Sequence, residues 1–134
     1  MAGPVLESVR PAFRAFAATV VPEAALLDSA GWRELESIVD RAVAARPRKV
    51  QRQLRLLLRL IEHLPRLRRG RPFTRLSPAE RNRFLTGLQD SPVLVLRRGV
   101  WGLRTLVFMG YYARQAAAVK IGYRAHPRGW EVRR

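Results

Sequence analysis

The sequence predicts an all-α protein, a compact orthogonal or irregular bundle of about five or six helices with an extended C-terminal tail. Apolar residues recur at helical spacing in successive segments, prolines and capping residues mark the segment borders, and strand patterning is nearly absent. With 134 residues, 48% of them hydrophobic, the chain has the length and composition for one core. We expect a single helical domain over 1–134, with an ordered core at about 9–123 and flexible termini.

Two helices are predicted in the first third of the chain. Pro11 suits the first turn of a helix that ends at Pro22, because a first-turn residue needs no amide hydrogen. The apolar stripe of this helix consists of Phe13, Phe16, Ala17 and Val20. Asp28 or Ser29 can cap a second helix that ends before Pro47. Its stripe consists of Leu35, Ile38, Val39 and Ala42.

A third helix, from about Arg48 to Leu64, has the clearest amphipathic pattern. One face carries Val50, Leu54, Leu57, Ile61 and Leu64. The opposite face carries Arg48, Arg52, Arg55 and Arg59. Pro65 is expected to stop the helix, and a basic linker follows over 66–73 with Arg66, Arg68, Arg69 and Arg71. These arginines form either a solvated surface or an anion-binding face with a phosphate-contacting loop.

The segment from Ser77 to Tyr112 predicts two helices that meet at a corner. Ser77 and Glu80 fit a capping box with proline at the first helical position, and Asp90, Ser91 and Pro92 repeat the start signal. The second of these helices is apolar enough to suggest a membrane span. Its three internal arginines, each costing about 2.5–3.5 kcal/mol at a bilayer centre, exclude that interpretation. They are Arg97, Arg98 and Arg104.

This last helix carries more apolar surface than one buried stripe requires. The first stripe consists of Leu96, Val100, Leu103 and Val107, and the second of Leu94, Trp101, Phe108 and Tyr112. Gly99, Gly102 and Gly110 suggest that a neighbouring backbone comes close. The second stripe is therefore either central core or the seat of a partner chain. Arg97 and Arg104 are expected to pair with partner carboxylates or with Asp90 and Glu80.

The final residues predict a helix end and a docking tail. Gly122 suits the left-handed position that closes a helix. Tyr123 and Trp130 then fall in an irregular extension, where aromatic side chains usually contact the parent domain or another subunit.

Composition predicts acidic partners and argues against catalysis by this chain. Lys and Arg number 26 against 10 Asp and Glu, for a net charge of +16. Cysteine is absent, His63 and His126 lack companions at metal-ligand spacing, and no phosphate-binding loop follows a strand. We therefore expect neither catalytic residues nor a metal or cofactor in this chain. The N-terminal residues show no secretory or twin-arginine signal, so the cytoplasm is the expected location.

Several of these residues also follow a family pattern. The order Phe73, Leu76-Ser77-Pro78-Ala79-Glu80-Arg81, Leu85, Leu88, Ser91, then an apolar helix ending Tyr111-Tyr112, then Ile121-Gly122-Tyr123, resembles the gluconate 2-dehydrogenase small-subunit (subunit 3) family. It is also similar to the helical segment that precedes the flavin domain of glucose-methanol-choline long-chain alcohol oxidases. The segment FAATVVP, 16–22, looks like the first helix of that family.

The resemblance implies a non-catalytic small subunit that binds and stabilises a separate FAD-dependent glucose-methanol-choline-type oxidoreductase. FAD would be held by the partner subunit. The expected interface consists of Trp101, Arg104, Phe108, Tyr111, Tyr112, Gly122, Tyr123 and Trp130. An alternative function is a basic helical nucleic-acid-binding protein that uses the Arg48–Arg71 region. A third is peripheral contact of the same arginines with anionic lipid.

Overall fold

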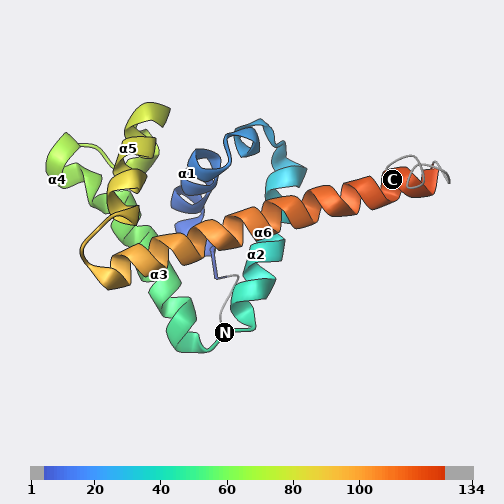
Figure 1. Cartoon of the computed structure of the whole chain (residues 1–134), viewed down its shortest axis with the longest axis horizontal. Coiled ribbons are helices and arrows are strands. Elements are labelled where there is room, and N and C mark those ends of the chain that lie inside the picture. The colour runs from blue at the N-terminus through green and yellow to red at the C-terminus, as the bar shows by residue number, and fades with distance from the viewer. Residues whose placement is uncertain (1–4, 126–134) are drawn as a thin grey trace.

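The structure is a computed structural model that describes residues 5–125, with backbone alone for 115–125 (Figure 1). Within these residues it is all-α, which confirms the predicted fold class, and no strand is present. The α-helices are α1 (Arg10–Val20), α2 (Ser29–Ala44), α3 (Arg48–His63), α4 (Pro65–Arg69), α5 (Pro78–Gln89) and α6 (Leu94–Ala125). Three short 3-10 helices, η1 (Glu7–Val9), η2 (Pro22–Leu26) and η3 (Phe73–Arg75), connect them.

Helix α1 lies at the centre of the bundle. It contacts α3, α5 and α6, and Phe13 and Phe16 on its apolar stripe are fully buried. Ala17 is buried with them, while Val20 at the end of the stripe is only partly covered. The helix ends where Val21 becomes extended before Pro22, as the sequence predicts.

Helix α2 begins at the predicted cap. The Asp28 carboxylate accepts a hydrogen bond from Gly31 N at 2.7 Å, which satisfies an amide that the helix itself leaves unpaired. Leu35 and Val39 of the predicted stripe are buried, and Val43 extends the buried line by one turn. This line faces α6 and α3.

Helix α3 keeps its predicted core face, with two corrections around it. Leu54, Leu57, Leu58 and Ile61 are buried. Val50, placed on that face by its spacing, is 40% exposed because it lies in the first turn, beyond the reach of neighbouring helices. Helix α3 ends just before Pro65, as predicted, but Pro65 begins the short helix α4, and the expected linker over 66–73 is therefore partly helical. Gly70 closes α4 in the left-handed conformation, at φ 70°.

Both predicted serine signals are present, but the second acts differently. Ser77 and Glu80 form the reciprocal capping box of α5. Ser91 Oγ accepts a hydrogen bond from Val93 N at 3.0 Å, and α6 begins at Leu94, two residues later than Pro92 predicts. The serine thus shapes the turn before α6 and does not cap the helix.

Helix α6 crosses the other helices and extends past them (Figure 1). It contacts α1, α2, α3 and α5. The helix continues through Gly122 and Tyr123 to Ala125, so the prediction of a helix end at Gly122 and an irregular extension at Tyr123 is wrong. A glycine costs a helix only about 1 kcal/mol, and the alanine-rich turns before it favour continuation. Trp130 lies outside the described residues.

Candidate protein-protein interface on helix α6

The two predicted stripes of α6 have different environments. Val100, Leu103 and Val107 are buried against the bundle, and Leu96 is partly covered. On the second stripe, by contrast, Trp101 is 48% exposed and Tyr112 is 50% exposed. Phe108 between them is partly buried. The described residues of this chain therefore leave much of the second stripe uncovered.

An arginine joins the aromatic side chains of this stripe into a continuous row. The Arg104 guanidinium carbon lies 5.2 Å from the Trp101 ring centroid and 5.3 Å from that of Phe108. The Phe108 and Tyr112 rings are nearly parallel, with centroids 6.0 Å apart. These residues recur every three or four positions, so each contact joins neighbouring turns. We call Trp101, Arg104, Phe108 and Tyr112 the aromatic row.

Arg104 is held in this position from α5. Its Nη1 donates a hydrogen bond to Gln89 Oε1 at 3.0 Å. The sequence suggested Asp90 or Glu80 as its partner within the chain, and this is wrong for Glu80, whose carboxylate contacts Arg69 and Arg71. The side chain of Arg97 makes no hydrogen bond or ion pair with the described residues. An arginine fixed between two rings has already lost part of the freedom that binding would otherwise remove.

Tyr111 belongs to the core and not to the exposed surface. It is 6% exposed, and its ring meets Tyr112 edge-on at 5.4 Å between centroids. Its inclusion in the interface is therefore a correction: adjacent helix positions point about 100° apart, so Tyr111 faces inward while Tyr112 faces out. Gly122 and Tyr123 lie farther along α6, where only the backbone is described.

The glycines of α6 have unlike surroundings. A Cβ on Gly99 would lie 3.1 Å from Leu57 Cδ2, and one on Gly110 would lie 2.8 Å from Leu35 Cδ1. The closest neighbours are thus side chains of α3 and α2, and the expected backbone approach is present at Gly110, where Leu35 O would lie 3.7 Å from the Cβ. A Cβ on Gly102 would meet nothing within 4 Å. Gly102 and the 43% exposed Met109 lie on the outer side of α6, where apolar surface continues beyond the aromatic row.

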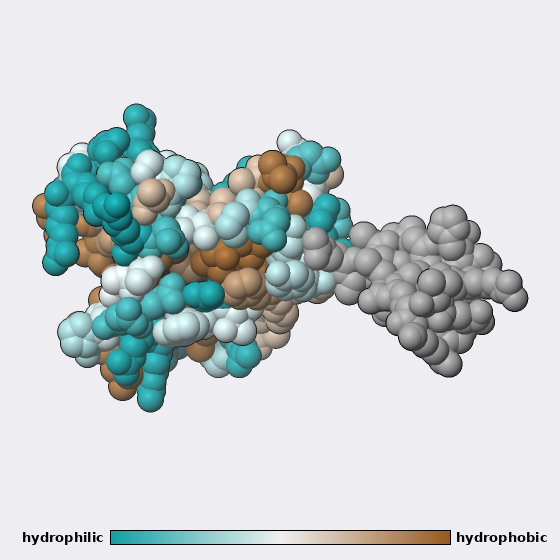
Figure 2. Space-filling view, turned by 45° about the horizontal axis from the view of Figure 1, so that its top comes forward, coloured by the Kyte–Doolittle hydropathy of each residue, from teal (hydrophilic) through white to brown (hydrophobic). Residues whose placement is uncertain are grey.

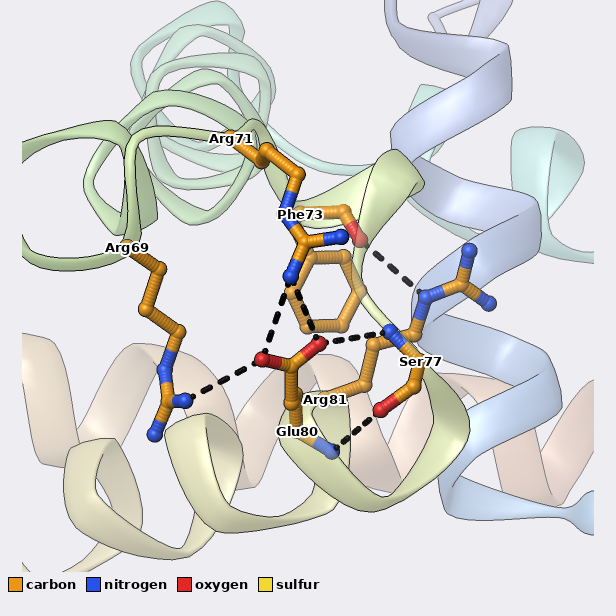
Figure 3. Close-up of polar contacts among 6 residues, drawn as sticks. All are labelled: Arg69, Arg71, Phe73, Ser77, Glu80 and Arg81. Carbon is orange, nitrogen blue, oxygen red and sulfur yellow. Dashed lines mark hydrogen bonds and ion pairs between the residues drawn. The ribbon is translucent and has the colours of Figure 1, made fainter.

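The predicted anion-binding residues divide into free and engaged arginines. Arg48, Arg52, Arg59, Arg66 and Arg68 are exposed, and Arg55 is partly so. Figure 3 shows Arg69 and Arg71 converging on Glu80, at 3.2 and 3.3 Å. The Ser77 backbone amide, which donates to Glu80 Oε1 at 3.0 Å, holds the pKa of Glu80 below its usual value. The Ser77 hydroxyl and the charges of Arg71 and Arg69 act in the same direction.

One charged cluster was not predicted from the sequence. Glu36 is 5% exposed, with its Oε1 3.1 Å from Arg10 Nε and its Oε2 accepting a hydrogen bond from Arg14 Nε. Asp40, one turn later, accepts a hydrogen bond from Leu6 N at 2.9 Å. The available signal was that Glu36 and Asp40 each follow a core residue, Leu35 and Val39, while Arg10 and Arg14 share one face of α1.

These acids attach the N-terminal segment to α2 and do not resemble a reaction centre. Among residues 5–125, no three His, Cys, Asp or Glu side chains gather in a way that could hold a metal ion. None of the helices in that range combines the length and hydropathy needed to cross a bilayer. His63 is exposed on α3, and His126 lies outside the described residues. The aromatic row is thus the candidate site, and its chemistry is that of a binding surface.

The family model described as gluconate 2-dehydrogenase subunit 3 matches residues 10–130. The chain belongs to this family. The match covers α1 to α6 and confirms the resemblance predicted from the sequence. No curated protein and no solved structure matches the chain.

Membership of the gluconate 2-dehydrogenase subunit 3 family indicates an accessory subunit of a dehydrogenase complex. It gives the exposed aromatic row a context, because a subunit of a hetero-oligomeric complex requires a surface for another chain. Tyr, Trp and Arg are enriched at protein interfaces, and an exposed apolar area is typical of an interaction site. The nucleic-acid alternative for the arginines of α3 and α4 stays a prediction.

Proposed function

We propose that this chain is a non-catalytic subunit that binds and stabilises a separate FAD-dependent oxidoreductase of the glucose-methanol-choline type. The aromatic row on α6 carries the proposal. Trp101 and Tyr112 each keep about half of their surface exposed, whereas the other aromatic side chains that the structure describes are buried or partly buried. The partner subunit would cover this surface and hold the flavin.

The aromatic row has the composition of an interface centre. A few Trp, Tyr and Arg residues carry most of the binding energy in typical complexes, and each is most effective when water is excluded around it. Trp101 is the largest exposed side chain of the row and Arg104 is held beside it. We expect Trp101 to enter an apolar pocket of the partner, with Phe108 and Tyr112 extending the contact.

The charges around the row favour an acidic rim on the partner. Arg97 and Arg98 are exposed on the turn before Trp101. Charges at the rim of an interface mainly accelerate the encounter and contribute less to the final affinity. A partner with Asp and Glu around an apolar centre would therefore meet this surface quickly at low salt.

Reconstitution with a flavoprotein of the glucose-methanol-choline type from the same host tests the proposal. The two chains are co-expressed with a tag on this one, and the purified material is examined for stoichiometric association and flavin absorbance. A flavoprotein that does not associate, and that is equally stable without this chain, would contradict the proposed function.

Variants then test whether the flavoprotein binds through the aromatic row, separately from whether it binds at all. Trp101→Ser and Phe108→Ser should abolish association while circular dichroism shows a helical chain. Leu26→Ser is the matched control, because Leu26 is 87% exposed on η2 and away from the row. If the flavoprotein binds the wild type and both α6 variants equally well, the function stands and the aromatic row is not its interface.

A further inference from the structure

Three leucines on the outer side of α3 and α4 are exposed to solvent. Leu56 is 58% exposed, Leu60 is 37% exposed and Leu67 is 84% exposed. Their neighbours Leu54, Leu58 and Ile61 are buried in the core. Figure 2 shows brown side chains among teal ones at the end of the molecule that α4 forms, on the left. Such leucines are not needed to complete the bundle.

The three leucines follow one line along the helical surface. At about 100° per residue, Leu56 points away from the core residues of α3, and Leu60 lies at the edge of the core face. Leu64 keeps helical dihedral angles, φ −56° and ψ −39°, between α3 and α4. The helical phase therefore continues across Pro65, and Leu67 lies seven residues after Leu60 on the same line.

A parallel line of arginines accompanies the leucines. Arg52, Arg59 and Arg66 are spaced by seven residues and are all exposed. None of them has a side-chain hydrogen bond or an ion pair within the part of the chain that the structure describes. This separates them from Arg69 and Arg71, whose charges meet Glu80 (Figure 3).

No carboxylate interrupts this surface. Glu62 is the only acidic residue between Arg48 and Arg71, a stretch with nine Lys and Arg residues. Its carboxylate turns toward η3, where it accepts hydrogen bonds from Thr74 N at 3.0 Å and Thr74 Oγ1 at 2.8 Å. The outer side of α3 and α4 thus combines protruding leucines with positive charge, while the carboxylate of Glu62 is hydrogen-bonded to Thr74.

We propose that the outer side of α3 and α4 binds the surface of an anionic lipid bilayer. Arg52, Arg59 and Arg66 would contact the lipid headgroups, and the leucine line would enter the boundary between headgroups and acyl chains. Helices that lie in this plane join a basic side with apolar residues in this way. The proposal concerns a surface other than the aromatic row and does not depend on the flavoprotein partner.

The leucines distinguish lipid from other anionic partners. Nucleic-acid phosphates would attract the arginines but would leave three protruding leucines without an apolar environment. A folded acidic protein would need a pocket shaped for each of them. A bilayer is fluid and accepts separate leucines on a convex surface without such pockets. A lipid bilayer would therefore contact both the leucines and the arginines of this surface.

Vesicle flotation of the full chain tests this surface. Wild type should float with vesicles of equal parts phosphatidylcholine and phosphatidylglycerol and should remain in solution with pure phosphatidylcholine. Leu56→Ser with Leu67→Ser should lower the partition coefficient about tenfold or more, because two apolar contacts are lost. Arg52→Gln with Arg59→Gln should lower it by a similar factor, and more strongly at low salt.

Leu26→Ser is the matched control, since it removes an 87% exposed leucine from η2 and should leave flotation unchanged. Circular dichroism checks that every variant is helical. Absence of binding to the phosphatidylglycerol vesicles would overturn the proposal. Vesicle binding that the leucine variant does not alter would also overturn it, because the chain would then bind only as a polycation. Binding of the leucine variant to duplex DNA would identify this behaviour.

Discussion

Gly110 of α6 lies so close to Leu35 of α2 that a Cβ on the glycine would stand 2.8 Å from Leu35 Cδ1. Val39 Cγ2 would be 3.0 Å away, and both residues are fully buried. Helix α6 can therefore cross α2 at this close distance because Gly110 has no side chain. One side of α6 is covered and the other is exposed, and substitutions of its glycines test the packing on each side.

We expect Gly110→Ala to lower the free energy of unfolding by about 1 kcal/mol. Overpacking of a core typically costs about 1–3 kcal/mol, and alanine returns up to about 1 kcal/mol of helix propensity. Urea unfolding followed by circular dichroism measures the difference. An alanine variant more stable than wild type would mean that α6 does not cross α2 at this close distance.

Gly102→Ala provides the opposite prediction on the same helix. A Cβ there meets nothing within 4 Å, so the substitution should raise the free energy of unfolding of the isolated chain by about 0.5–1 kcal/mol. Urea unfolding again provides the measurement. Association with the flavoprotein should be measured as well, because a loss of binding together with a gain of stability would extend the interface to this side of α6.

Glu36→Gln should lower the free energy of unfolding by about 1–3 kcal/mol, because it removes the charge that Arg10 and Arg14 share. Both arginines are partly exposed and can turn to water, which limits the loss. Glu34→Gln is the matched control. Its side chain is 61% exposed and lies 3.8 Å from Arg114, an arrangement worth about 0–1 kcal/mol. Equal effects in thermal or urea unfolding would contradict the special role of Glu36.

Asp40 should make the chain less stable as pH rises. Burial raises the pKa of Asp40, opposed by the hydrogen bond from Leu6 N and assisted by the charge of Glu36. The native state thus holds this proton more tightly than the unfolded chain. Its contribution is most favourable below the ordinary carboxyl pKa and is lost as pH rises through the raised pKa.

Two substitutions separate the charge of Asp40 from its hydrogen bond. Asp40→Asn keeps an acceptor for Leu6 N and should be at least as stable as wild type at neutral pH, an advantage that shrinks in acid. Asp40→Ala should cost about 1–3 kcal/mol, because Leu6 N loses its partner. Urea midpoints at neutral and acid pH compare the three chains. If asparagine is as harmful as alanine, the charge itself is required.

Glu80 should have the opposite pH dependence. Its lowered pKa means that it stabilises the fold above the ordinary carboxyl pKa, and that this contribution is lost as pH falls through the folded value. Glu80→Gln should flatten the acid limb of the stability curve. It should also release Arg69, so trypsin should cleave the Arg69–Gly70 bond faster than in wild type, whereas Pro72 protects the bond after Arg71. Unchanged cleavage would show that Glu80 does not restrain the segment after α4.

Local interactions account for much of what could be predicted. Asp28 and the Ser77–Glu80 pair cap helices where the sequence placed them, because a cap is formed by residues within one turn of each other. The buried line of Val100, Leu103 and Val107 follows from helical spacing for the same reason. The linker predicted after Pro65 and the helix end predicted at Gly122 were wrong for a related reason, since proline can also begin a helix and glycine permits a helix end without requiring one.

The sequence by itself determined the helical class, most helix starts and the core-facing stripe of α6. Only the tertiary structure decided that Trp101 and Tyr112 stay exposed, that Gly110 receives Leu35 and that Glu36 is enclosed by two arginines. Hydrogen bonds and dihedral preferences act between neighbours in the chain. Burial depends on which distant segments meet, and several arrangements of these helices would satisfy the same local pattern.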